Sequence, residues 1–151
     1  MTNPIDISAS GLSAQRQRMQ VIANNLANMS TTNAHEITEE IDGQKFVKYL
    51  PYRRQLVTFQ ADEAGGDGNS FGVSVPQIAE DMSEFRKVYD PSHPHAAKNP
   101  KDADYGYVLY PNVDPLMEMT SMIMASRAYE ANVTAIDTYK SMVSSSLRIL
   151  A

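Results

Sequence analysis

The sequence predicts a mainly α-helical fold with a small β region, in which long helices at the two chain ends flank a β-rich middle. Three observations support this prediction. A capping residue followed by proline stands near each end, apolar residues recur at heptad spacing after each of these pairs, and six of the seven glycines lie in between, at residues 30–113. With 151 residues, the chain can form one ordinary domain or a small folded middle with extended arms.

The first helix is predicted to begin near Ile5 and to end near Asn28. Asn3 supplies an N-cap and Pro4 a pre-set first turn. Apolar side chains then form a heptad seam, which is stronger in its second half because polar residues interrupt the first half. The residues of this seam are Ile5, Leu12, Met19, Ile22, Leu26 and Met29.

Residues 30–113 are predicted to form a small β region. Four segments are rich in β-branched and aromatic residues, which favour strands, and they comprise residues 46–50, 52–60, 71–75 and 85–89. The glycines at positions 65, 66 and 68 mark a turn between two of these segments. Residues 90–104 contain three prolines and several small or charged residues, so we expect an irregular loop there.

The second helix is predicted to cover residues 116–150. Asp114 and Pro115 repeat the capping pattern, and neither glycine nor proline follows them. A helix of this length extends about 52 Å, which is longer than a compact domain of this mass would bury, so part of it is expected to contact other chains. Its heptad positions hold Met122, Tyr129, Ile136, Val143 and Leu150 in one series and Met119, Val133 and Leu147 in the other.

We predict that both helices build an assembly interface. The apolar seams are expected to pack within the chain and between neighbouring chains, because sliding them would expose apolar area at a cost of about 25 cal/mol per Å². Asn24 and Asn25 are expected to bond across subunits and fix the register, although Asn24 can equally be solvated and Asn28 can end the helix in a left-handed cap. The predicted interface comprises Ile5, Leu12, Met19, Ile22, Asn24, Asn25, Leu26, Met119, Met122, Tyr129, Val133, Ile136, Val143, Leu147 and Leu150.

The composition argues against several classes of partner. Thirteen Lys and Arg stand against eighteen Asp and Glu, a net charge of −5, so nucleic acid is not an expected partner. The chain has no cysteine, which excludes disulfides, thiolate metal sites and thiol nucleophiles. No apolar run approaches the roughly 20 residues that a membrane-spanning helix needs. The first 30 residues show no apolar core of a secretory signal, so a cleaved signal peptide is not expected.

No catalytic, cofactor-binding or metal site is predicted. His93 and His95 lie near Asp90 but lack a third clear ligand, so a solvated loop is the favoured interpretation. His35 stands near three glutamates without the apolar surroundings that general acid–base catalysis requires. The glycine-rich residues 65–68 lack the lysine of a phosphate-binding loop. We therefore expect a protein that is not an enzyme and that uses no cofactor.

Segments near both chain ends resemble the signatures of bacterial flagellar axial proteins, the family of rod and hook subunits. At the beginning these segments are Ser10-Gly11-Leu12 and Ala23-Asn24-Asn25-Leu26-Ala27-Asn28. Near the end they are Glu118-Met119 and Ala125-Ser126-Arg127-Ala128-Tyr129-Glu130-Ala131-Asn132-Val133. Four further segments look most like the proximal rod members of the family: Pro51-Tyr52-Arg53-Arg54, Tyr89-Asp90-Pro91, Gly106-Tyr107-Val108 and Pro111-Asn112-Val113-Asp114.

The resemblance, which covers nearly the whole chain, implies a structural subunit of the flagellar drive shaft that polymerises helically and transmits motor torque. It implies a coiled-coil-like D0 domain made from residues 1–29 and 114–151, with residues 30–113 as the middle insertion. The implied partners are further copies, other rod proteins, ring and export-gate proteins of the basal body, and the type III apparatus that exports the unfolded chain. The implied location is the basal-body rod where it crosses the periplasm.

Three other interpretations are open at this point. Another axial protein, such as a different rod subunit or a hook-type protein, would share the terminal signatures, and residues 51–54 favour the proximal rod over it. A coiled-coil adaptor or export chaperone would share the heptads but would remain a small oligomer. A small hydrolase would need a convergent polar site in a pocket, which the sequence does not offer.

Overall fold

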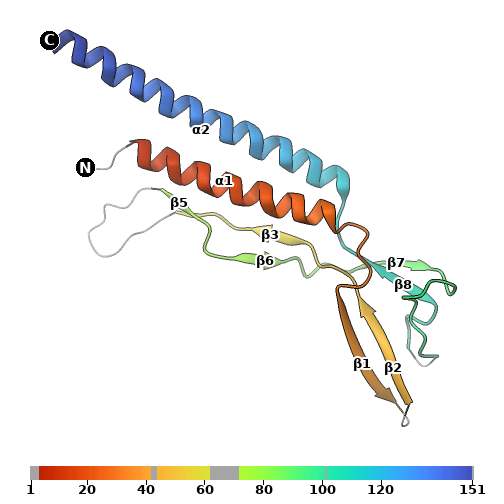
Figure 1. Ribbon diagram of the computed structural model, residues 1–151. Helices are drawn as coiled ribbons and strands as arrows, with labels where there is room; N and C mark the ends of the chain where they lie inside the picture. Colours follow the sequence, from red (N-terminus) through yellow and green to blue (C-terminus); the bar gives the residue numbers. More distant parts are fainter. Residues whose placement is uncertain (1–3, 42–43, 62–71, 101, 151) are drawn as a thin grey trace. The chain divides into compact units, whose positions relative to one another are not determined.

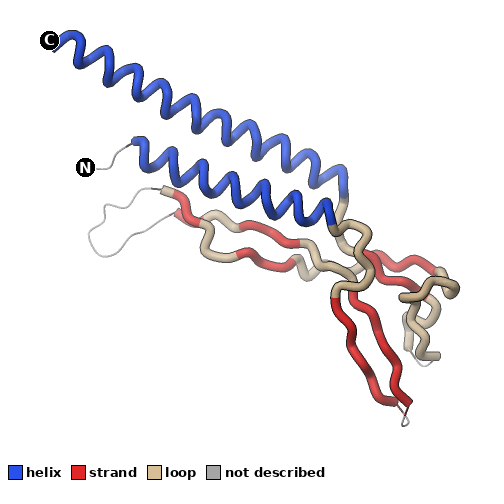
Figure 2. The backbone as a smooth tube through the Cα atoms, in the orientation of Figure 1, coloured by secondary structure: helices blue, strands red, loops and turns tan. Residues whose placement is uncertain are grey.

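Two long helices dominate the computed structural model, which describes residues 4–41, 44–61, 72–100 and 102–150 (Figure 1). Helix α1 spans Pro4–Ala27 and helix α2 spans Pro115–Leu150. Short strands lie between them in the sequence and pair two by two, as Figure 2 shows in red. The predicted fold class, mainly α-helical with long terminal helices and a small β region, is confirmed.

The chain divides into two compact units, and each helix contributes to both. Unit 1 contains residues 1–23, 56–79 and 119–151, and unit 2 contains residues 24–55 and 80–118. The division into residues 1–29, 30–113 and 114–151 that the sequence suggested describes how the chain would be organised in an assembly, and it stays a prediction.

In unit 1, α1 lies between α2 and a group of short strands. The two helices run antiparallel (Figure 1), and a Cβ added to Gly11 on α1 would lie 3.1 Å from the amide nitrogen of Asn132 on α2. On the other side of α1, the hydroxyl of Ser10 accepts a hydrogen bond of 3.0 Å from the backbone N–H of Val73. The guanidinium of Arg18 lies 5.8 Å from the ring centre of Phe59. Both faces of α1 are therefore in contact with other segments of the unit.

The core of unit 1 is thin and made mostly of small side chains. Its buried apolar residues among those described are Ala14, Val21, Ile22 and Ala125. Small side chains let the helices approach closely, but each one removes little apolar area from water. The strands contribute two pairs, in which β3 (Gln55–Val57) pairs with β6 (Ile78–Glu80) and β4 (Gln60–Ala61) pairs antiparallel with β5 (Val73–Ser74).

Unit 2 holds two antiparallel hairpins. Strand β1 (His35–Ile41) pairs with β2 (Gln44–Leu50), and β7 (Arg86–Tyr89) pairs with β8 (Tyr107–Tyr110). Val108 on β8 is 1% exposed, and Ala96 from the loop between β7 and β8 is 2% exposed. Ion pairs hold the same loop, from Lys48 to Asp102 at 2.7 Å and to Asp104 at 3.9 Å, and from Lys87 to Asp104 at 2.6 Å. The loop is thus fixed to both hairpins.

The predicted elements agree with the structure at the helices and only partly at the strands. Both helices begin and end within two residues of the expected positions, although the predicted cap Asn3 lies outside the described residues. Strands β3, β5 and β7 fall within the predicted segments, and β2 and β4 overlap them but extend one or two residues beyond. Residues 90–104 carry turns and no strand where they are described. The predicted turn at residues 65–68 and the beginning of the segment 71–75 lie outside the described residues.

Three strands escaped the sequence analysis. β1 is rich in glutamate, which is depleted in strands, and it forms because β2 pairs with all seven of its residues. β6 has three exposed residues, and β8 was recognised only as part of a family signature. Within the described ranges, neither helix is apolar over a stretch long enough to cross a membrane.

Replacing Gly106 should destabilise unit 2. Gly106 has a φ of +77°, and an added Cβ would lie 2.8 Å from the ring of Tyr89. Gly106→Ala adds left-handed backbone strain, about 1–2 kcal/mol, to this steric conflict. We expect urea unfolding of the purified chain to report a loss of about 2 kcal/mol. Ala103→Gly, at an exposed position of the same loop, is the control, and equal losses in the two variants would contradict this account.

Candidate assembly surfaces

The predicted seam residues on α1 are the more buried of the two sets. Ile22 is 5% exposed, and the other apolar positions of this set are half-buried, at Ile5, Leu12, Met19 and Leu26. Leu12 and Tyr129 line one shallow groove between the two helices. The apolar positions of the α1 seam are therefore buried or half-buried within the chain, and their role between chains stays a prediction.

Some of the buried and half-buried residues of α2 lie outside the predicted set. Ala125 is 0% exposed, and Asn132 and Tyr139, seven and fourteen positions later, are half-buried. The predicted positions Met122, Tyr129 and Ile136 are half-buried beside them. The remaining predicted residues of α2 are exposed, at Met119, Val133, Val143 and Leu147, and the side chain of Leu150 lies outside the described part.

Large apolar side chains face solvent along much of α2. Seven of them are more than half exposed: Leu116, Met117, Met119, Ile123, Met124, Met142 and Leu147. Soluble monomers rarely expose so many large apolar groups on one element, and such surfaces commonly mark interaction sites. At 1.5 Å per residue, the 36 residues of α2 extend about 54 Å. The helix is therefore long and apolar outside the seam as well as within it.

A buried polar cluster in unit 2 is centred on Asn25, which is 1% exposed. Its side-chain oxygen accepts hydrogen bonds from the Tyr52 hydroxyl and the Gln55 N–H, both 2.9 Å long. Its side-chain nitrogen donates to the Gln55 carbonyl at 2.9 Å and to Oε2 of Glu118 at 3.2 Å. Both acceptor sites and both donor hydrogens of the amide are thereby used inside the chain.

Arg54 and Glu118 form the charged half of this cluster, in which Glu118 is 1% exposed. Nε and Nη2 of Arg54 lie 2.8 and 2.7 Å from Oε1 of Glu118, and Nη1 lies 3.4 Å from Oδ2 of Asp81. Burial opposes the charged guanidinium, but Glu118 and then Asp81 raise the pKa of Arg54 above its usual value. Burial, followed by the charges of Glu118 and Glu80, raises the pKa of Tyr52, which keeps its hydroxyl a donor.

Backbone bonds lock Arg54 to the segment around Asp81. The N–H of Arg54 donates to Oδ1 of Asn112 at 2.9 Å, and the N–H of Asp81 donates to the Arg54 carbonyl at 2.8 Å. The Asn112 amide donates to the Asp81 carbonyl at 3.0 Å. The pKa of the Asp81 carboxyl is lowered, and the largest cause is the hydrogen bond from the N–H of Ser83, to which Arg54 adds. The cluster thus joins the end of α1, residues 52–55, residues 81–83 and the first turn of α2.

The three predicted asparagines have different surroundings. Asn24 is exposed, and its amide nitrogen donates two long hydrogen bonds of 3.4 Å, to the Tyr52 hydroxyl and to Gln55. Its side-chain oxygen accepts a hydrogen bond of 3.0 Å from the Asn28 amide. The Asn28 amide donates to the Asn24 carbonyl at 2.9 Å, so it satisfies a carbonyl of the last helical turn. Of the three, only Asn24 is exposed, whereas Asn25 is buried and Asn28 is half-buried.

Glu118 and Arg54 are the functional residues that sequence reasoning missed. Both stand in segments quoted for the family resemblance, yet a glutamate in the first turn of a helix usually faces solvent and favours the positive end of the dipole. The predicted cap Asp114 does bind the first turn, accepting a hydrogen bond of 2.9 Å from the N–H of Leu116. Nothing in the sequence indicated that Glu118 would be buried while Asp114 caps the helix.

The histidines serve loop structure in the described part of the chain. Nδ1 of His95 lies 2.8 Å from the Thr32 hydroxyl, and Nδ1 of His93 accepts a hydrogen bond of 3.1 Å from the backbone N–H of His95. Among the described residues, no group of three His, Cys, Asp or Glu side chains is arranged to hold a metal ion.

Comparison with known proteins shows similarity to flagellar rod proteins over nearly the whole chain. The family described as flagella basal body rod protein matches residues 5–35, and the flagellar basal body rod FlgEFG protein C-terminal family matches residues 105–149. A flagellar basal-body rod protein FlgC from Bacillus subtilis is 42% identical over 96% of this chain and 95% of its own length. The FlgC proteins of Salmonella typhimurium and Borreliella burgdorferi are each 39% identical, over 99% and 97% of this chain and 97% and 95% of their own lengths. The resemblance found in the sequence is thereby confirmed.

Removing the charge of Glu118 should destabilise unit 2. Glu118→Gln keeps the size and one acceptor oxygen but leaves the Arg54 guanidinium without its closest carboxylate. Because that guanidinium is 25% exposed, we expect a loss of about 2–3 kcal/mol in urea unfolding, below the 3–5 kcal/mol typical of fully buried pairs. Lys87→Gln breaks an exposed ion pair and is the matched control, for which little change is expected. Equal losses in both variants would argue against a special role for Glu118.

Acid should weaken unit 2 through Asp81. Because folding lowers the pKa of this carboxyl, its contribution is fully present above about pH 4 and is lost as the pH falls through the lower folded value. Asp81→Asn should therefore show a flatter decline in unfolding free energy between pH 5 and pH 2.5 than the parent chain, measured by urea titration. Asp6→Asn, at an exposed position in the first turn of α1, is the control. A parent-like acid slope for Asp81→Asn would refute this assignment.

Proposed function

This chain belongs to the FlgC family of flagellar basal-body rod proteins, and from that membership we propose that it is a structural subunit of the proximal rod that polymerises helically into the motor's drive shaft. The observation that carries the proposal is the exposed apolar surface of α2. A helix about 54 Å long that buries one face on α1 and exposes large apolar side chains elsewhere needs further chains to cover it.

The assembly surface is assigned to the two helices. The exposed members of the predicted set are the strongest candidates for contacts between chains, because burying them would remove apolar area from water at about 25 cal/mol per Å². They are Met119, Val133, Val143 and Leu147, and Asn24 adds an exposed amide that can help set the register. The half-buried set has a double role, since Ile5, Leu12, Met122, Tyr129 and Ile136 support the α1–α2 pair and still offer surface to a neighbour.

Such packing suits a shaft that carries torque. Interlocked apolar side chains resist sliding, because each change of register exposes area that was buried. In this proposal the helices form the D0 domain of the rod, and residues 30–113 are its middle insertion. The buried bonds of Asn25, Arg54 and Glu118 join α1 and α2 to that middle region, so torque can pass between them without relying on apolar contact alone.

The proposal also includes the binding partners of the protein and its location in the cell. The partners are further copies, other rod subunits, ring and export-gate proteins, and the type III export apparatus, and the site of action is the rod across the periplasm. The role is structural and not enzymatic. The apolar and polar surfaces described above support this role, and they favour it over a coiled-coil adaptor, whose exposed apolar stripe would be a single narrow seam.

Ile136→Asp should prevent incorporation into the rod. The substitution places a charge at a half-buried position of the helix pair, where desolvation of a carboxylate is costly. We expect a deletion strain carrying this variant to swim at less than about a tenth of the complemented rate and to yield basal bodies without complete rods by electron microscopy. Thr138→Asp adds the same charge at an exposed position two residues later and should retain most motility.

The outcomes of this experiment separate the proposals. Rings without a rod in the deletion strain, restored by the parent gene, would support the rod function, whereas complete rods without the gene would point to the adaptor. Normal rods with Ile136→Asp would leave the rod function standing and remove the packing model.

A further inference from the structure

Two contacts between α1 and α2 follow one antiparallel register. In the first, a Cβ added to Gly11 would lie 3.1 Å from the side-chain nitrogen of Asn132. In the second, the Asn25 amide donates a hydrogen bond of 3.2 Å to Glu118. Asn25 stands fourteen residues after Gly11, and Glu118 stands fourteen residues before Asn132. Fourteen residues are two heptads, about 21 Å of helix, so both contacts lie on the same line along each helix.

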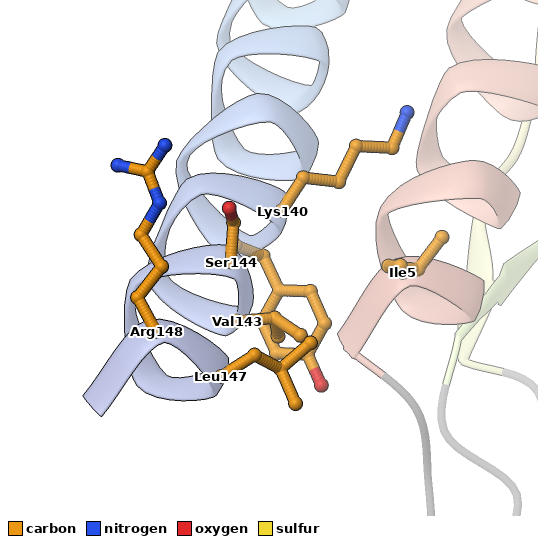
Figure 3. A pocket seen from close by; sticks show the side chains of 7 residues that line it. Ile5, Lys140, Val143, Ser144, Leu147 and Arg148 are labelled. Carbon is orange, nitrogen blue, oxygen red and sulfur yellow. The ribbon is translucent and has the colours of Figure 1, made fainter. Parts of the chain in front are cut away.

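The same register continues toward the beginning of α1 and the end of α2. Ile5, Tyr139 and Val143 line one groove there, and Figure 3 shows Ile5 on α1 across from Val143 on α2. Ile5 stands six residues before Gly11, and Tyr139 stands seven residues after Asn132. Apolar contacts have no preferred direction, so they hold two helices together without fixing how far one can slide along the other.

A heptad seam by itself permits more than one register. A shift of one heptad, about 10.5 Å, again sets apolar positions of one helix opposite apolar positions of the other. Buried polar groups distinguish such registers, because hydrogen bonds are directional and are lost when the partners move apart. The apolar positions of α1 that recur every seven residues are Ile5, Leu12, Met19 and Leu26.

The buried polar cluster ties both helices to one short segment. The Asn25 side chain on α1 bonds the backbone N–H and carbonyl of Gln55, both at 2.9 Å. Oε1 of Glu118 on α2 lies 2.8 and 2.7 Å from two nitrogens of Arg54, the residue before Gln55. Asn25 and Glu118 are each 1% exposed, so bulk water cannot take over these bonds. A shift of one heptad would move one helix about 10.5 Å from these partners and leave buried polar groups unpaired.

From these contacts we propose that the buried polar cluster sets the register of the α1–α2 pair, with Asn25, Arg54 and Glu118 as its positioning residues. Buried ion pairs add little net stability, because desolvation offsets their attraction, and fixing a register is the best-attested use of buried polar groups. The register determines which outward side chains of α2 stand beside α1. This role belongs to the subunit itself, and only its consequence for the rod, a uniform surface for assembly, rests on the proposed function.

Disulfides can report the register directly, because the sequence contains no cysteine. Gly11→Cys with Asn132→Cys reports the present register. The sulfur on residue 132 would stand near the present amide carbon, which lies 3.4 Å from a Cβ at position 11. Gly11→Cys with Ala125→Cys, or with Tyr139→Cys, reports a shift of one heptad in either direction. These two positions lie about 10.5 Å along α2 from residue 132, out of reach of position 11 unless the helices shift.

Arg54→Met combined with Glu118→Leu is the main test, because it replaces both charges by apolar side chains of similar size. In the parent chain, mass spectrometry of the oxidised monomer should find at least about tenfold more 11–132 disulfide than either shifted disulfide. In the double variant this ratio should fall below about threefold, while the midpoint of urea unfolding stays at or above that of the parent. A merely structural ion pair would not separate register from stability in this way.

Lys48→Met combined with Asp102→Leu is the matched control. It removes a half-buried ion pair of 2.7 Å that joins β2 to the loop between β7 and β8, and it should keep the tenfold ratio of disulfides. A folded Arg54→Met and Glu118→Leu chain that also keeps the tenfold ratio would overturn the inference, whatever its stability. The register would then be assigned to the seam between the helices.

Glu118→Gln decides if the double variant shows no cooperative unfolding. The glutamine keeps an acceptor oxygen for Arg54 but presents N–H groups to the Asn25 amide, which then has no acceptor there. The ratio of disulfides should fall at least about threefold, and an unchanged ratio would overturn the inference. These measurements use the subunit alone, so their failure leaves the proposed rod function standing. Absence of the parent chain from basal bodies would instead overturn that function.

Discussion

The buried contact between Arg54 and Glu118 is the interaction on which the organisation of unit 2 depends. A carboxylate that is 1% exposed needs partners for both oxygens, and here Arg54 satisfies one and Asn25 the other. Because hydrogen bonds are directional, this requirement fixes where the last turn of α1, the segment before β3 and the first turn of α2 meet. Asn112 and Asp81 then follow, since both bind the backbone of Arg54.

Polar bonds and apolar surface are distributed unequally over this chain. The most specific contacts are concentrated in unit 2, where polar side chains are buried and paired. In unit 1 the seam between the helices is built from small side chains, and the large apolar groups of α2 face outward. A compact enzyme would bury those groups in its own core. A subunit of a polymer keeps them for its neighbours, and the chain's membership in a rod family agrees with that distribution.

The helices could be predicted from the sequence because their signals are local. Asp114 and Pro115 mark the beginning of α2, and the heptads of both helices carry over many turns. The strands were harder, since β1 depends on pairing with β2 and not on its own glutamate-rich composition. The candidate assembly surfaces and the buried polar cluster differ in the same way, between local signals and long-range contacts. Periodicity located the apolar positions along both helices, whose role in assembly stays a prediction. The Arg54–Glu118 pair instead depends on a contact between residues 64 positions apart, which no local pattern reveals.

The small size of the residues between the helices has a consequence for how the subunit gains its stability. A Cβ added to Gly11 would lie only 3.1 Å from the amide nitrogen of Asn132, and Ala125 is completely buried. The two helices are therefore close together, but their contact removes little apolar area from water. Long helices with so thin a seam are only weakly held in a single chain. Contacts made on assembly add their free energy to folding, because anything that binds the folded state stabilises it. In the proposed assembly, burial of the outward side chains of α2 would therefore add to the folding free energy of the subunit as well as to its binding.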